Sequence, residues 1–256
     1  MSKTLAIVQA RMSSTRLPGK VLKELGGRPL IGFMLERVRR ARHIDEIVLA
    51  TSTDASDDEL AATVQALGFG VHRGSLDDVL ARFAGAAEGR GADVLVRLTG
   101  DCPLIDPTLI DRAVEHLRGN GLDYVTNGEP AMYPDGLDVE AFTHAALQRA
   151  FVEAKLPSER EHVTPYLRVP EAGFRRGSLA GAVDLSSLRW TVDHADDLAV
   201  VRALVDAFGA EAALQADLFD FLRVLDARPA LLKVNPHQRN EGYLKSLQQD
   251  AASLAA

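Results

Sequence analysis

The sequence predicts an α/β protein built on one mainly parallel sheet. Short apolar runs alternate with helical segments through the first half of the chain. Runs such as 3–9 and 46–51 are apolar almost throughout, as expected of strands buried on both faces. Strands joined by helices of this length form βαβ units, whose strands run parallel. We therefore expect a single α/β domain.

The first half of the chain carries four expected strands and four expected helices. The strands lie at 3–9, 46–51, 70–72 and 93–98, and the helices at 30–42, from 56, at 77–88 and from 107. Ser56, with Glu59 three residues later, predicts a capping box at the start of the second helix. Pro107 suits the first turn of the fourth helix, where its missing N–H costs nothing.

The alternation becomes less regular beyond about residue 120. Further strands are expected at 123–126, 137–142, 174–179 and 188–192, and helices at 143–155, 159–167, 196–208 and 214–226. This change predicts a small inserted or appended lobe at about 120–180 within a domain spanning 1–235. The remainder, 236–256, is polar and is expected to be a partly mobile tail.

Composition excludes several classes of function. The formal net charge of −7 is opposite in sign to the basic surplus of proteins that bind long nucleic acids. No apolar run reaches the roughly 18 residues that span a bilayer, and the N-terminus does not resemble a signal peptide. The single cysteine, Cys102, permits no intrachain disulfide, which fits a cytoplasmic protein. Cys102 is interpreted as a small buried residue, with a nucleophile as the alternative.

The segment from Gln9 to Lys20 directly follows the first expected strand. It carries three cations, Arg11, Arg16 and Lys20, among three hydroxyl side chains. Ligands of open α/β sheets bind beyond the carboxyl ends of the strands, and Arg and Lys are the usual partners of phosphate oxygens. The segment therefore predicts a phosphate site, with a solvated basic loop as the alternative. The sequence contains neither a P-loop nor a G-x-G-x-x-G motif, which disfavours a P-loop kinase and a dinucleotide-dependent dehydrogenase.

Two acidic residues follow other expected strands. Asp101 comes after 93–98, with Gly100 allowing the backbone to bend, and Asp193 comes after 188–192. Carboxylates in such places hold Mg²⁺ against substrate phosphates. Each also suits a turn or a helix N-terminus, as do Asp196 and Asp197.

Two stretches that mix acids, rings and turn residues are candidates for binding a second substrate. They are 133–140 and 159–166, and either is equally compatible with a structural turn. The candidate contacts are Asp138, Glu140, Arg160 and His162. Arg160, His162 and Arg168 are also of the residue types that bind a carboxylate.

Six segments together resemble a known family. They are Q-A-R-x-x-S-T-R-L-P-G-K at the N-terminus, G-S-L-D-D-V-L-x-R-F at 74–83, R-L-T-G-D-C-P-L-I-D at 97–106, G-L-D-V-E at 136–140, E-H-V-T-P-Y at 161–166 and T-V-D-x-x-x-D-L at 191–198. In this order and at these spacings they resemble the cytidylyltransferases of spore-coat polysaccharide biosynthesis. That group is similar to the synthetases of CMP-sialic acid and CMP-ketodeoxyoctonate. The resemblance covers about residues 3 to 205.

The resemblance implies a Rossmann-like three-layer α/β/α sandwich, the nucleotide-diphospho-sugar transferase fold. It implies attack of an acceptor oxygen on the α-phosphorus of CTP, with release of pyrophosphate, in polysaccharide or glycoconjugate biosynthesis. The acceptor is expected to be an acidic sugar or a related small molecule. A homodimer is expected because relatives are commonly dimers.

The resemblance also implies roles for individual residues. Arg16, Lys20 and Asp101 are expected to be catalytic, and Asp101 and Asp193 to hold Mg²⁺ or Mn²⁺. The residues expected to bind the nucleotide are Ala10, Arg11, Ser13, Ser14, Arg16, Lys20, Thr99 and Gly100.

The sequence departs from the family pattern in two places. Ser13 stands where relatives commonly have Gly, so a positive φ there would strain the loop. The residues after Asp193 also differ from the usual Thr-Pro-Glu-Asp.

Two alternatives to CTP-dependent transfer remain open. One is a transferase that uses GTP, UTP or TTP with a sugar phosphate or phosphonate as acceptor. The other is a nucleotide-sugar binding protein without catalysis, which the joint presence of Lys20, Asp101 and Asp193 disfavours.

Overall fold

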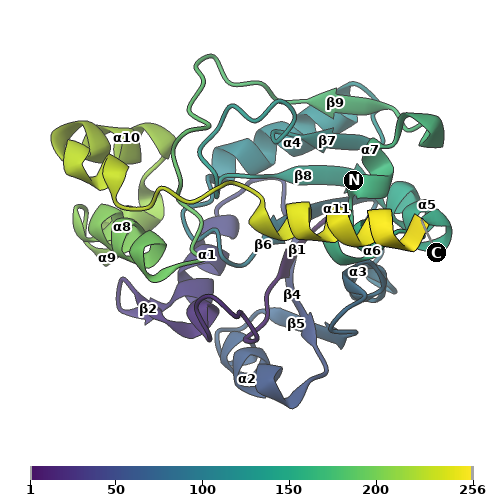
Figure 1. Cartoon of the computed structure of the whole chain (residues 1–256), viewed down its shortest axis with the longest axis horizontal. Helices are drawn as coiled ribbons and strands as arrows, with labels where there is room; N and C mark the ends of the chain where they lie inside the picture. Colours follow the sequence, from purple (N-terminus) through teal and green to yellow (C-terminus); the bar gives the residue numbers. More distant parts are fainter. Residues whose placement is uncertain (1, 255–256) are drawn as a thin grey trace.

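A seven-stranded mixed sheet forms the centre of the protein (Figure 1), whose computed structural model describes residues 2–254. In spatial order the strands are β5 (Gly70–Gly74), β4 (Glu46–Ser52), β1 (Thr4–Gln9), β6 (Val94–Thr99), β8 (Glu140–Thr143), β7 (Tyr124–Thr126) and β9 (Arg176–Ser178). Neighbouring strands pair in parallel except that β8 runs antiparallel to both β6 and β7. The prediction of a mainly parallel sheet is confirmed.

Helices cover both faces of this sheet. They are α1 (Leu30–Val38), α2 (Asp58–Ala66), α3 (Val79–Ala87), α4 (Pro107–Gly119), α5 (His144–Glu153), α6 (Pro157–His162), α7 (Pro165–Arg168), α8 (Ala195–Asp206), α9 (Ala210–Gln215), α10 (Leu218–Ala227) and α11 (Glu241–Leu254). Alternation along β1 divides the core, because Ala6 and Val8 pack on the side of α1 and α4 while Leu5 and Ile7 pack on the side of α3 and α5. The expected three-layer sandwich is confirmed.

Short elements complete the fold. A hairpin of β2 (Glu24–Leu25) and β3 (Arg28–Pro29) precedes α1, and single 3₁₀ turns lie at Lys20–Leu22, Ala55–Asp57, Pro170–Ala172 and Pro229–Lys233. None of the helices within residues 2–254 is long and apolar enough to cross a bilayer. The segment 120–180, expected as a lobe, contributes β7, β8 and β9 to the common sheet and α5 to α7 beside it.

Several element boundaries differ from the sequence predictions. The capping box at Ser56 is absent, because Asp54 accepts the Ser56 N–H at 2.8 Å and a 3₁₀ turn precedes α2. The helix expected at 159–167 is broken at Val163, whose φ of 71° ends α6. The helix expected at 214–226 is two helices, α9 and α10. The strand expected at 188–192 is reduced to one isolated bridge between Asp135 and Arg189.

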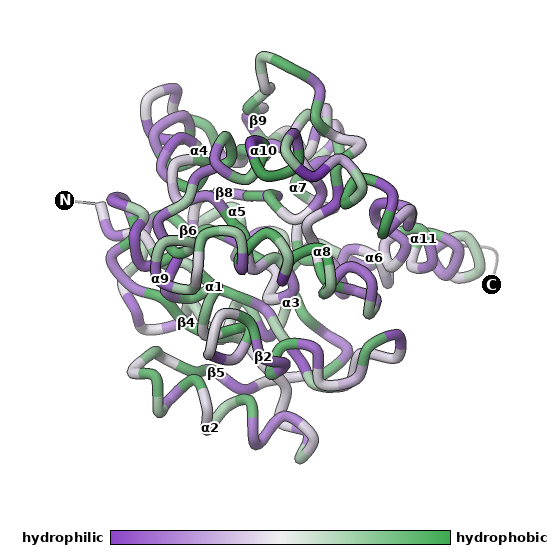
Figure 2. The backbone as a smooth tube through the Cα atoms, turned by 90° about the vertical axis from the view of Figure 1, so that its left-hand side faces the viewer, coloured by the Kyte–Doolittle hydropathy of each residue, from purple (hydrophilic) through white to green (hydrophobic). Residues whose placement is uncertain are grey.

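The C-terminal segment, expected to be a polar and partly mobile tail, contains a helix. Residues 241–254 form α11, which packs beside α6 and is yellow in Figure 1. Figure 2 shows α11 at the edge of the molecule, with hydrophilic and hydrophobic residues both present along it. The chain between α10 and α11 crosses the carboxyl ends of the central strands, as the cavity residues described below establish.

The buried guanidinium of Arg37 connects the sheet side of α1 to the helices α9 and α10. All five of its N–H groups donate to backbone carbonyls, so the buried charge is fully hydrogen-bonded. The acceptors are the carbonyls of Leu104, Ile105, Ala213, Leu214 and Ala216, at 2.7–3.3 Å. Burial lowers the pKa of Arg37 to about 10, which leaves the side chain charged at neutral pH.

We predict that Arg37→Met lowers the free energy of unfolding by about 3 kcal/mol or more, because the five carbonyls lose their donors and remain buried. Urea denaturation followed by circular dichroism measures the loss. The matched control is Arg223→Met on α10, an exposed side chain whose ion pair with Asp220 is worth at most about 1 kcal/mol. Equal effects of the two substitutions would contradict the role given to Arg37.

Candidate active site

The basic loop after β1 is held in a closed conformation by its own backbone. The N–H of Gly19 donates to the Met12 carbonyl at 3.1 Å, and the N–H of Met12 donates to Asp57 at 2.7 Å. Gly19 has a φ of 65°, which glycine adopts without strain. Ser13 is not among the described residues with positive φ, so the departure from glycine at this position causes no backbone strain.

Lys20 lies between the two carboxylates that the sequence singles out. Its Nζ is 2.7 Å from Asp101 Oδ2 and 2.8 Å from Asp193 Oδ1. Burial opposes the charge on Lys20, but the two carboxylates outweigh it and raise the pKa of the ammonium. Burial likewise opposes the charge on Asp193, and Lys20 outweighs it and lowers the pKa of that carboxyl.

Close backbone packing brings Asp101 to this position. The N–H of Gly100 donates to the Gln9 carbonyl at 2.7 Å, which joins the ends of β6 and β1. A Cβ at residue 100 would lie 2.7 Å from the Cβ of Ala10, so only glycine permits this approach. The Asp101 carbonyl in turn accepts the N–H of Val192 at 2.8 Å, which places Asp193 opposite Asp101.

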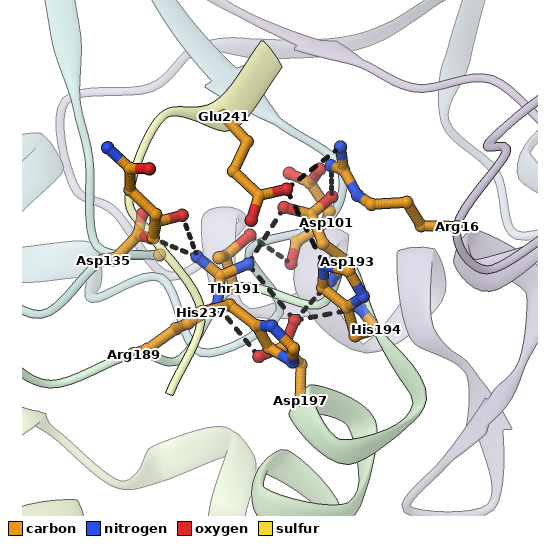
Figure 3. Close-up of polar contacts among 12 residues, drawn as sticks. Arg16, Asp101, Asp135, Arg189, Thr191, Asp193, His194, Asp197, His237 and Glu241 are labelled. Atoms are coloured by element: carbon orange, nitrogen blue, oxygen red, sulfur yellow. Dashed lines mark hydrogen bonds and ion pairs between the residues drawn. The ribbon is translucent and has the colours of Figure 1, made fainter. Parts of the chain in front are cut away.

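A second cation, Arg189, pairs with three acidic residues, one of which is Asp193 (Figure 3). Its guanidinium lies 2.7 Å from Asp135, 3.0 Å from Asp193 and 2.9 Å from Asp197. Asp197 is fully buried and accepts the backbone N–H groups of Asp193 and His194, both at 2.9 Å. Asp197 is thus the acid at the start of α8, and it fixes the backbone that carries Asp193.

Arg16 extends this network toward the solvent. Its guanidinium lies 2.7 Å from Asp193 and 3.5 Å from Glu241, the first residue of α11 (Figure 3). Arg16 therefore joins the basic loop to a segment more than 200 residues away in the sequence. The sequence analysis missed Glu241, because it lies in a region interpreted as a tail.

Two cavities meet at these charged groups. The first is lined by every residue expected to bind the nucleotide, and also by Arg82, Glu161 and Gly242, which the sequence analysis did not single out. The second shares Arg16, Asp101, His162 and Asp193 with the first and extends toward β7 and β8. A ligand in each cavity would therefore touch the same pair of carboxylates.

The second cavity contains three of the four residues expected to bind an acceptor. Asp138, Glu140 and His162 line it, but Arg160 does not. Arg160 pairs with Asp78 beside a different cavity, so the structure removes the spatial argument for its role as an acceptor contact.

Several residues of the second cavity were not singled out as acceptor contacts. Among them are three guanidinium groups, those of Arg97, Arg189 and Arg239. Arg168, for which the sequence suggested carboxylate binding, also lines this cavity. Glu140 is held by Arg97, by the hydroxyl of Tyr124 at 2.6 Å and by that of Thr164 at 2.5 Å. An isolated charged side chain within a strand, such as Arg97 in β6, gives little signal in a single sequence.

Cys102 is buried against the second cavity. Burial, with Asp101 nearby, raises the pKa of its thiol well above the ordinary value. A thiol held in its neutral form is a poor nucleophile, so the alternative role suggested by the sequence finds no support.

Three groups of side chains have the composition of a metal site. Asp101 and Asp193 offer carboxylate oxygens that converge on the Nζ of Lys20, and carboxylate oxygen is the donor type that Mg²⁺ and Mn²⁺ prefer. Nearby, His194, His237 and Glu241 have ligand atoms within 4.8 Å of one another, and so do Asp196, Asp197 and His237. Only the first group lies at the junction of both cavities.

A cation-lined cavity that meets a second cavity at two carboxylates, beside a mainly parallel sheet, suits a nucleotidyl-transferring class of α/β protein. Residues 5–208 match the family model described as cytidylyltransferase, and the chain belongs to that family.

Individual relatives agree with this membership. The chain is 34% identical to the spore coat polysaccharide biosynthesis protein SpsF of Bacillus subtilis, over 90% of this chain and 96% of the relative. It is 40% identical to the 3-deoxy-manno-octulosonate cytidylyltransferase of Geobacter sulfurreducens, over 45% of each chain. The solved structure of a cytidylyltransferase from Leptospira borgpetersenii superposes with a TM-score of 0.86 and 31% identity, covering 93% of this chain and 100% of that one.

His162 generates a prediction about pH. Burial, with Arg97 nearby, lowers the pKa of its imidazole to about 4 from an ordinary value of 6.5. Below pH 6.5 the unfolded chain binds a proton at His162, whereas the folded chain does not bind it until the pH approaches 4. The free energy of unfolding therefore falls as the pH drops from 6.5 to about 4. The loss is on the order of 3 kcal/mol at most.

We predict that His162→Gln makes the decline of unfolding free energy between pH 7 and pH 4 shallower than in the wild type. Urea denaturation across this pH range measures the slopes. NMR titration of the His162 ring provides a direct check, and protonation near pH 6.5 would contradict the prediction.

Proposed function

We propose that the protein transfers CMP from CTP to an acidic sugar or a related small acceptor and releases pyrophosphate. The observation that carries this proposal is the position of Lys20, Asp101 and Asp193 at the junction of two cavities. One cavity is suited to a triphosphate and the other to an acceptor, so the α-phosphorus and the attacking oxygen would meet at this junction. Membership of the cytidylyltransferase family supports the choice of CTP.

In the reaction, a bond forms between the acceptor oxygen and the α-phosphorus of CTP. The bond from that phosphorus to the oxygen bridging to the β-phosphate breaks, pyrophosphate leaves and the acceptor hydroxyl loses its proton. Such transfers depend on positioning and on neutralising phosphate charge more than on covalent participation of the protein. The proposed catalytic residues Arg16 and Lys20 supply cations at the required place.

The ion pairs of the site hold its cations where the phosphates of the substrate would bind. Arg16 and Lys20 are paired with carboxylates, so their charges are already held in position before a phosphate arrives. Arg11 and the buried Arg82 line the same cavity and add two further positive charges. Phosphate oxygens would replace the carboxylates as partners of Arg16 and Lys20, and a divalent cation bound by Asp101 and Asp193 would then compensate those two carboxylates.

We propose that Asp101 and Asp193 hold Mg²⁺ or Mn²⁺ with the nucleotide. The ion, when bound, would neutralise phosphate oxygens and lower the pKa of the attacking hydroxyl. Thr191, adjacent in the second cavity, and the buried Asp197 hold the backbone on either side of Asp193. We further propose a cytoplasmic enzyme that acts in polysaccharide or glycoconjugate biosynthesis as a homodimer, as is common among its relatives.

We predict that Lys20→Met lowers kcat by at least about 100-fold, because one preorganised cation at the phosphate is removed. The assay measures pyrophosphate released from CTP, UTP, GTP and TTP in the presence of Mg²⁺ and a panel of acidic sugars. The control is Lys23→Met in the same segment, whose side chain lines neither cavity. Unchanged turnover in the Lys20 variant would exclude the assigned role, and a preference for another nucleotide would correct the choice of CTP.

We predict that a chelator abolishes turnover and that Mg²⁺ or Mn²⁺ restores it. In Asp101→Asn the Mg²⁺ concentration needed for half-maximal rate rises by about 10-fold or more, because one of two anionic ligands is lost. Calorimetry with CTP at several Mg²⁺ concentrations tests the same site without turnover. Full activity in the chelator would argue against the metal.

A further inference from the structure

The chain from Asn235 to Asp250, here called the C-terminal strap, begins well beyond residue 208, where the match to the family ends. Its first part is bound to α8 and the residues before it. Asn235 donates to the Arg189 carbonyl at 3.0 Å and to Asp197 at 2.9 Å, and His237 contacts Asp196 at 2.9 Å.

The far part of the strap is bound to α6 on the opposite side of the site. Ser246 contacts His162 at 2.9 Å and donates to Glu161 at 2.6 Å, while Asp250 accepts the N–H of Ser158 at 2.9 Å. Between these two attachments the strap crosses both cavities. Gly242 lines each of them, and Arg239, Asn240, Glu241 and Tyr243 line the second.

The buried face of α11 is polar. Ser246 and Asp250 are 1% and 6% exposed, whereas Leu244 and Leu247 are each 41% exposed. Apolar packing is therefore not what selects this position of the helix. The polar partners of α11 lie at the rims of the two cavities, which indicates that the strap is placed to complete the site.

Arg239 brings the strap into the second cavity. Its guanidinium donates to the Tyr133 carbonyl at 3.0 Å and to Asp138, contacts that engage two of its five N–H groups. Its partner Asp138 has a side chain that is 37% exposed, and ion pairs with such exposed groups contribute little. An anionic group of a ligand can therefore replace Asp138 at little cost.

The other deep guanidinium groups of this cavity are more firmly engaged. Arg189 contacts three carboxylates, and Arg97 is paired with Glu140, whose pKa is lowered despite burial. Arg168 stacks 5.3 Å from the ring of Tyr243, another strap residue, and pairs with Glu129 at the rim. The cation best able to change partners is thus carried by the strap.

We propose that Arg239 is the residue that determines acceptor specificity, by binding a carboxylate of the acceptor as a planar, bidentate partner. This inference rests on the proposed transfer reaction for its substrate and names the chemical class: a sugar acid in its anionic form. The strap then supplies substrate selection, while the basic loop and the two carboxylates supply the transfer chemistry.

The experiment compares acids with their neutral methyl esters. The probes are 3-deoxy-manno-octulosonate, a nonulosonic acid and the methyl ester of each. In the wild type we expect kcat/KM for an accepted acid to exceed that for its ester by about 10- to 100-fold, the range of a charge-assisted bidentate contact. In Arg239→Gln the ratio falls to about 3 or less, mainly through the acceptor KM, and Arg239→Lys restores part of it.

The matched control is Arg223→Gln on α10, which leaves the ratio and both KM values unchanged. The KM for CTP also stays within about twofold in Arg239→Gln, which separates acceptor recognition from a general disturbance of the site. An Arg239→Gln enzyme that keeps the wild-type ratio, or that loses CTP affinity equally, overturns the inference.

The inference and the proposed function fail in different ways. A wild type that transfers CMP to esters as readily as to acids supports the proposed function and overturns the role of Arg239. Calorimetry of the acids and esters, with a non-hydrolysable CTP analogue present, measures recognition without turnover. An acid preference there that Arg239→Gln removes supports the inference even if no pyrophosphate is released, and the absence of such a preference overturns it.

Discussion

The contact of Lys20 with Asp101 and Asp193 is the interaction on which the rest of the site depends. A buried ammonium is costly unless anions compensate it, so the folded chain must bring both carboxylates to the same point. They come from segments 81 and 173 residues away along the chain. The close approach of Gly100 to β1 and the capping of α8 by Asp197 are the structural means of meeting this requirement.

The same constraint explains why the site is ready for a polyanion in a protein of net charge −7. Arg16, Lys20 and Arg189 are each paired with carboxylates in the structure. Because these cations are already held in position, the site needs no assembly of their charge when a polyanion binds. Arg189 contributes differently, because its three carboxylate partners hold it as part of the supporting framework.

The sequence predicted which charged groups meet at this edge of the sheet because parallel strands end at a common edge. Arg16, Lys20 and Asp101 follow predicted strands, and simple topology brings them together. Asp193 also lies at this edge as expected, but the strand predicted before it is only an isolated bridge. The predicted position was therefore right, and the reason given for it was partly wrong. Arg160 lies outside the second cavity, and the strap was interpreted as a tail. The direction of Arg160 from a short helix has no sequence signal, and the buried face of α11 is polar, a composition that resembles a solvated tail.

Two different kinds of segment build the site: strand ends form the edge that carries Lys20, Asp101 and Asp193, and the strap forms one wall of the second cavity. This division has a physical reason. The edge must hold charges to within fractions of an ångström, and it is made from segments tied to the central sheet by backbone hydrogen bonds. In the proposed reaction the wall would match one particular acceptor, and a segment bound by side-chain contacts at its two attachments can change sequence without disturbing the sheet. Arg239 lies between those attachments, facing Asp138 on the sheet side of the cavity. Chemistry and selection are thereby separated within one chain.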